Sequence, residues 1–170
     1  MLCSVPSESH APQKPVSRHW TKRTTHMSYV IQAIVARTGD LQVPSEHFRL
    51  LQLRQRVELL PLTAAIMKAC QVTALPLTDS PPQLDALPKI EALLVTASVR
   101  GKAAYIEAEY FGGKGIQAAV LAERSVILGG PIRSPHAINE ALSFLGVSRA
   151  GATDEFEAVG LGDRRHTDQW

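Results

Sequence analysis

Two glutamates spaced two residues apart are the side chains of this chain best placed for chemistry. Glu107 and Glu109 lie in the strand-like run Ala103–Tyr110, in which alternation puts both carboxylates on one face together with Tyr105. Side chains two positions apart along a strand are about 7 Å apart. That separation suits an acid–base pair acting around a water molecule, or two ligands of a hard cation such as Mg²⁺. It equally suits a solvent-exposed or partner-binding face, because two acids without a third ligand or a nucleophile do not specify a site.

A glycine-rich turn follows the two glutamates. Residues 112–115 read Gly-Gly-Lys-Gly and separate two strand-like runs, so they lack the strand-to-helix context of phosphate-binding loops. Glycines there permit positive φ angles and the close approach of a ligand, but an ordinary hairpin loop also explains them. Gln117 lies just beyond the turn. One candidate site, for a protein partner or a metal ion, therefore consists of Glu107, Glu109, Gly112, Gly113 and Gln117.

The histidines and cysteines add little to this site. His166 has acidic and basic neighbours at positions 163–165 and 168, a charge pattern that is typical of a solvated chain end. Cys70 falls in a helical run and is expected in the packed core. The two cysteines of the chain provide no disulfide framework or zinc quartet, and no serine lies in a nucleophile-elbow pattern. We identify no catalytic residue set and predict no cofactor.

The elements that must position the glutamates are an antiparallel hairpin and its neighbours. Short links join the strand-like runs 103–110, 116–122 and 125–128, and short links force antiparallel neighbours. Earlier strand-like runs cover residues 29–36 and 56–60. Helices are predicted over residues 64–71 after Thr63, over 86–98 after Asp85, and from Ser134-Pro135 to Gly146, the last with Leu142 on its apolar face. The pattern predicts an α+β fold: a small antiparallel sheet of about four strands with two or three helices packed on it.

The charge distribution separates a short N-terminal segment from the rest. Residues 1–26 hold four basic side chains against Glu8 alone, whereas the remainder holds 14 basic and 15 acidic residues. We expect residues 1–26 to form a disordered basic extension and residues 27–170 to form a single domain. A nearly neutral domain without clustered basic and aromatic residues lacks the footprint of a nucleic-acid reader, although the basic extension leaves that class open. No apolar run approaches the length of a membrane span.

The hairpin sequence resembles one known group of proteins. Residues 105–113 (Tyr-Ile-Glu-Ala-Glu-Tyr-Phe-Gly-Gly), followed by Gln-Ala-Ala-Val at 117–120, are similar to a hairpin in small uncharacterised bacterial proteins. Residues 60–63 and 154–170 also fit that group. The resemblance implies no activity, but small proteins of such groups are sometimes immunity or accessory partners of bacterial toxins. Members usually begin near the equivalent of Met27.

The sequence therefore leaves three classes of function. The leading hypothesis is a cytoplasmic, non-enzymatic binding protein that contacts a protein partner through its acidic strand face and glycine turn, as an immunity or inhibitor protein would. The alternative is a small metal-dependent hydrolase built on Glu107 and Glu109, with Gln117 and the tail around His166 contributing. A nucleic-acid binder working through the basic extension is the third class.

Overall fold

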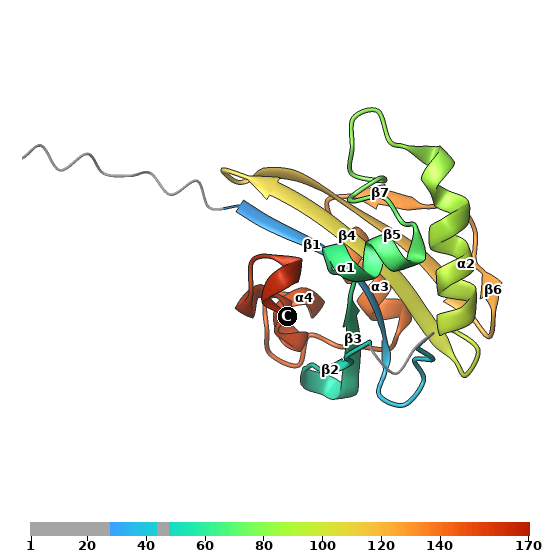
Figure 1. Ribbon diagram of the computed structural model, residues 1–170. Helices are drawn as coiled ribbons and strands as arrows, with labels where there is room; N and C mark the ends of the chain where they lie inside the picture. The colour runs from blue at the N-terminus through green and yellow to red at the C-terminus, as the bar shows by residue number, and fades with distance from the viewer. Residues whose placement is uncertain (1–27, 44–47) are drawn as a thin grey trace, which may run out of the picture.

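One antiparallel sheet organises the chain. The structure is a computed structural model that describes residues 28–43 and 48–170, so the predictions for residues 1–26 lie outside the described residues. Its strands are β1 (Ser28–Arg37), β2 (Leu51–Gln52), β3 (Val57–Pro61), β4 (Lys102–Phe111), β5 (Lys114–Glu123), β6 (Val126–Ile127) and β7 (Ile132–Ser134). They lie in the order β2-β3-β1-β4-β5-β6, and β7 also pairs with β5 (Figure 1). The α+β class is confirmed.

The sheet is larger than predicted. It has seven strands rather than about four. The strands that the sequence did not predict, β2 and β7, are two and three residues long, which is too short to show an alternating sequence pattern. The run predicted over residues 125–128 forms the short strand β6. Both β6 and β7 pair with β5, at Ala122–Glu123 and at Gln117–Ala119 respectively. One edge of the sheet is thus closed by two short strands placed end to end.

Helices cover both faces of the sheet. They are α1 (Ala64–Cys70), α2 (Leu87–Ala97), α3 (Ala137–Phe144) and α4 (Glu155–Val159). In Figure 1, α1 and α2 lie in front of the sheet, and α3 lies behind it. On the α2 face, Ile90 and Leu94 pack in one cluster with strand residues such as Ile34. On the α3 face, Ile138 and Leu142 pack in another cluster with strand residues such as Ile106.

The predicted helices form, but two of them start later than expected. The α2 helix begins at Leu87, after a short 3₁₀ turn that contains Asp85, so Asp85 is not its cap. The α3 helix begins at Ala137 because Ser134 is the last residue of β7. The Ser134 hydroxyl accepts the N–H of His136 at 3.1 Å, which forms a turn before the helix. None of the helices in the described residues combines the length and apolar character required to cross a bilayer.

The β4–β5 hairpin depends on one glycine that has no room for a side chain. Gly115 pairs with Tyr110 across the hairpin. A Cβ atom at Gly115 would lie 2.1 Å from the Glu109 carbonyl oxygen and 2.5 Å from the Cγ atom of Tyr110. Neither contact is tolerable, so the Tyr110 ring packs directly over the Gly115 backbone.

We expect Gly115→Ala to lower the free energy of unfolding by about 1–3 kcal/mol, because backbone and ring must both shift to admit one methyl group. Urea denaturation measures the loss. Gly130→Ala is the matched control: a Cβ there has no neighbour within 4 Å and the residue does not have a positive φ, so its stability should stay within about 0.5 kcal/mol of wild type. Equal stabilities for the two variants would contradict the packing described for Tyr110.

Candidate functional site

Glu107 is not on an exposed acidic face. Its side chain is 0% exposed, and its two carboxylate oxygens accept hydrogen bonds from the Thr78 backbone N–H and the Tyr105 hydroxyl. The segment 72–83 lies over this part of the sheet and excludes water from it. The expectation of a solvent-facing or partner-binding carboxylate is therefore wrong for Glu107, because a loop distant in sequence covers the strand.

Glu107 belongs to a buried polar network that fixes this loop. Gln32 of β1 donates from Nε2 to the Tyr105 hydroxyl at 2.8 Å and to the Thr73 carbonyl at 3.1 Å. Its Oε1 atom accepts the Leu75 N–H at 3.0 Å. Each polar group beneath the loop thereby gains a partner, as buried polar groups require. The network is architectural: it holds residues 73–78 on the sheet.

The environment of Glu107 disfavours its charged form. Burial raises the pKa of its carboxyl above the ordinary value of 4.5, while the hydrogen bonds from Tyr105 and Thr78 partly oppose the shift. A raised folded-state pKa means that the folded protein binds this proton more tightly than the unfolded chain does. The group therefore contributes most to stability below about pH 4.5, and that contribution is lost as the pH rises through the folded-state pKa.

We expect this pH dependence to disappear in Glu107→Gln. The free energy of unfolding of wild type minus that of the variant should fall as the pH rises from about 4.5 through the folded-state pKa of Glu107, because the glutamine amide does not titrate. Urea denaturation of both proteins across this range provides the measurement. A difference that stays constant or increases with pH would show that burial does not raise the pKa of Glu107.

The other predicted residues do not gather around Glu107. Glu109 is partly exposed, and Gly112 and Gly113 are the two turn residues of the hairpin, with φ angles of 58° and 81°. Two-residue hairpin turns with positive φ at both positions favour glycine, so the turn geometry accounts for both glycines. Among the described residues, no group of three His, Cys, Asp or Glu side chains could hold a metal ion. The structure thus brings together no ligand set for the metal-dependent alternative.

Gln117 faces the opposite side of the sheet from Glu107. It pairs with Ala108, a member of the α3-face cluster. Its Oε1 atom accepts the N–H of Ile138 at 3.0 Å, and its Nε2 atom donates to the Tyr110 hydroxyl at 3.1 Å. Gln117 therefore connects β5 to the start of α3 and cannot act with Glu107 on one ligand.

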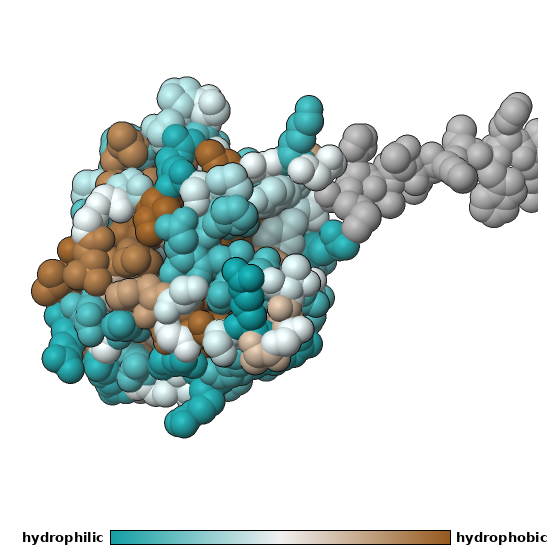
Figure 2. Space-filling view, turned by 180° about the vertical axis from the view of Figure 1, so that it is seen from behind, coloured by the Kyte–Doolittle hydropathy of each residue, from teal (hydrophilic) through white to brown (hydrophobic). Residues whose placement is uncertain are grey.

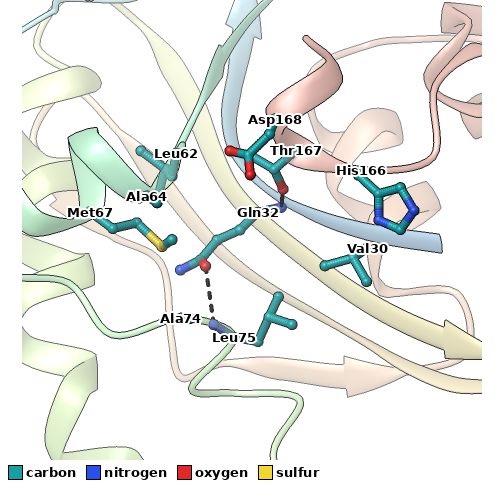
Figure 3. Close-up of a pocket in the computed structure, with 10 residues that line it drawn as sticks. All are labelled: Val30, Gln32, Leu62, Ala64, Met67, Ala74, Leu75, His166, Thr167 and Asp168. Carbon is teal, nitrogen blue, oxygen red and sulfur yellow. Dashed lines mark hydrogen bonds between the residues drawn. The ribbon is translucent and has the colours of Figure 1, made fainter. Parts of the chain in front are cut away.

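His166 and Asp168 line a small pocket on the α2 face (Figure 3). The pocket has a volume of about 200 Å³, and the turn Thr167–Gln169 faces Met67 and Ala64 across Gln32. The sequence did not indicate Gln32 or Thr167, because their partners come from the other end of the chain. The tail is more than a solvated end: it adds to β1 where β3 stops, with Val30 N–H donating to the Arg165 carbonyl at 2.7 Å.

The polar groups of this pocket do not form a catalytic triad. His166 Nε2 lies 3.4 Å from the Ser28 hydroxyl, a distance at the limit of hydrogen bonding. Thr167 Oγ1 accepts the N–H of Gln32 at 3.0 Å. A triad requires a carboxylate on the second ring nitrogen of the histidine, and no described residue provides one. The observed contacts anchor the C-terminal segment to β1.

An apolar surface lies at the β6 edge of the sheet on the α3 face. Ile127 packs into the α2-face cluster, so alternation directs Val126 and Leu128 to the opposite face. They are 59% and 41% exposed. Figure 2 shows a contiguous hydrophobic area on the side of the molecule where Figure 1 places β6. We call this area the edge surface; it consists of Leu121, Val126, Leu128, Ile132 and Phe144.

The strand pairing makes the edge surface continuous. Leu128 donates its N–H to the Leu121 carbonyl at 2.8 Å, which places the two side chains opposite each other. Ile132 of β7 pairs with Ala119, which lies on β5 as Leu121 does. Phe144 is the member of the edge surface that comes from α3, and the ammonium group of Lys102 lies 4.6 Å from the centre of its ring. Large apolar patches bordered by polar groups mark interaction surfaces in soluble proteins.

No protein-family model, curated protein or solved structure matches this chain. The resemblance to a group of bacterial proteins stays a prediction.

Proposed function

We propose that this chain is a non-enzymatic binding protein that docks on another protein through the edge surface. The exposed apolar side chains of Val126 and Leu128 carry the proposal. Their neighbours Leu121, Ile132 and Phe144 are partly buried and pack against the α3-face cluster, so the surface is preformed in the absence of a partner. Preformed apolar contact area is favourable for binding because little conformational entropy is lost on association.

Charged residues at one end of the edge surface favour a partner with an acidic border. Arg100, Lys102 and Arg124 meet there, since Arg124 donates its N–H to the Gly101 carbonyl at 3.0 Å. Glu123 and Asp40 are the acidic side chains nearby, which leaves basic groups in excess. A second copy of this chain would present the same basic end, so a different protein is the better complement. An immunity or inhibitor protein of the cytoplasm would be one protein of this kind.

Site-specific photo-crosslinking in the organism that makes the protein tests this function. A photoreactive phenylalanine analogue replaces Val126 in the full chain, and Ala92, exposed on α2, in the control. We expect one crosslinked partner from position 126, absent from position 92 and lost when Leu128→Asp is added. A position-126 adduct composed of two copies of this chain, or no position-specific adduct, would refute a different protein as the occupant.

The metal-dependent hydrolase receives no support from the geometry. Both carboxylate oxygens of Glu107 are engaged by Thr78 and Tyr105, and Gln117 lies on the other face. The third class, a nucleic-acid binder, would act through residues outside the described part of the chain. Among the three classes, protein binding is therefore the one that the contacts of the described residues support best.

A further inference from the structure

Three aromatic side chains line one hollow on the α3 face. The chain has nine aromatic residues in all, and Tyr29, Tyr110 and Phe156 border the same space of about 360 Å³. The hollow, which we call the aromatic hollow, lies toward the opposite end of β5 from β6, since Gln117 also lines it. Its volume is at the lower end of the range for small-molecule sites.

Hydrogen bonds hold two of the three aromatic residues, Tyr29 and Phe156, in position. The Tyr29 hydroxyl donates to the Leu161 carbonyl at 3.2 Å. Its ring meets that of Phe156 edge to face, with ring centres 5.5 Å apart and an interplanar angle of 70°. The Phe156 N–H donates to Asn139 Oδ1 at 2.9 Å, which holds α4 against α3. Both rings are therefore oriented without a ligand.

Gln117, a residue of the site predicted from the sequence, holds the third aromatic side chain, Tyr110. Gln117 donates to the Tyr110 hydroxyl at 3.1 Å, and the Tyr110 ring rests on Gly115. Because Gln117 is itself held by the Ile138 N–H at 3.0 Å, the phenol has little freedom to rotate. Groups of fixed aromatic rings are the typical recognition element for quaternary and methylated ammonium groups.

The charged side chains around the aromatic hollow are mainly acidic, and negative charge attracts a cation. Asp154 lines it, and the adjoining hollow, which shares Asp154, adds Glu140, Glu155 and Arg149. Arg149 is paired with Glu155 at 3.4 Å. The three carboxylates therefore outnumber the basic side chains, which are Arg149 and His136, the latter lining both hollows.

We propose that the aromatic hollow binds a quaternary or methylated ammonium group. The three aromatic rings supply cation–π attraction, and Asp154 supplies the countercharge. Such a group occurs on free small molecules and on methylated lysine side chains. Binding at this position requires no contact with the edge surface, so it is independent of the proposed protein partner.

Chemical-shift titration of the ¹⁵N-labelled full chain tests the proposal with matched probes. Choline and Nα-acetyl-trimethyllysine amide carry the cation, whereas 3,3-dimethylbutan-1-ol is the neutral isostere of choline. We expect at least one cation to shift the amides around Gln117 and Phe156 in a saturable way, and the isostere to bind about 3- to 30-fold more weakly. The tighter of the two cations identifies the source. Saturable binding of choline that its neutral isostere matches in affinity, or no saturable shift with either cation, would overturn the proposal.

Three variants locate the binding to this hollow. Phe156→Leu should weaken cation binding by about 3- to 30-fold, whereas Phe144→Leu, which removes an aromatic ring from the edge surface, should leave it unchanged. Asp154→Asn removes the countercharge but keeps a side chain that caps α4 equally well, and should also weaken binding. Thermal unfolding of each variant checks that the fold survives. Unchanged affinity in both Phe156→Leu and Asp154→Asn would place the site elsewhere and contradict the assignment.

Discussion

Replacing Glu107 with alanine is expected to destabilise the protein by about 2–4 kcal/mol. The substitution leaves the Thr78 N–H and the Tyr105 hydroxyl without their acceptor, and each buried donor without a partner costs about 1–3 kcal/mol. The alanine variant no longer buries a carboxyl group, and avoiding that desolvation cost offsets part of the loss. Urea denaturation measures the change, and amide hydrogen exchange should show Thr78 losing protection, because this hydrogen bond holds the loop on the sheet.

Glu109→Ala is the control for this prediction. Glu109 lies two residues further along β4 on the same face, but it is partly exposed. Its replacement should change the free energy of unfolding by no more than about 0.5 kcal/mol. If Glu107→Ala and Glu109→Ala were equally mild, the buried network would not be what fixes the loop over the sheet.

Leu142→Ala should cost about 2–5 kcal/mol of stability. Leu142 is 0% exposed in the α3-face cluster, and removing its branched side chain leaves a cavity that the surrounding helix and strands close only in part. The exposed neighbour Ser143 provides the comparison, since Ser143→Ala should be neutral or slightly favourable for the helix. A loss below about 0.5 kcal/mol for Leu142→Ala would mean that α3 packs on the sheet through another side.

The sequence predicted the local elements well because local patterns determine them. Alternation and the glycine turn correctly indicate the β4–β5 hairpin, and the apolar spacing of α3 correctly places Leu142 in the core. The strands β2 and β7 have too few residues to show a period. The number of strands was therefore underestimated, although the α+β class was correct.

The candidate site was the part that local patterns could not determine. Alternation states which side chains share a face, but it does not state what covers that face. Glu107 is buried because the loop that contains Thr78, 29 residues earlier in the chain, covers it and donates a hydrogen bond to it. The edge surface was missed for the related reason that Val126 and Leu128 look like ordinary strand residues until the cover on each face of the sheet is known.

Isothermal calorimetry with the partner identified by crosslinking is the most direct test of the central claim, that the edge surface binds a protein. The full wild-type chain, Leu128→Asp and the control Ala92→Asp would each be titrated with that partner. A charge placed at the centre of an apolar contact typically costs 2 kcal/mol or more, so we expect Leu128→Asp to bind at least about 30-fold more weakly than wild type. Ala92→Asp should bind as wild type does. Undiminished affinity in Leu128→Asp, with its fold intact by thermal unfolding, would contradict binding through the edge surface.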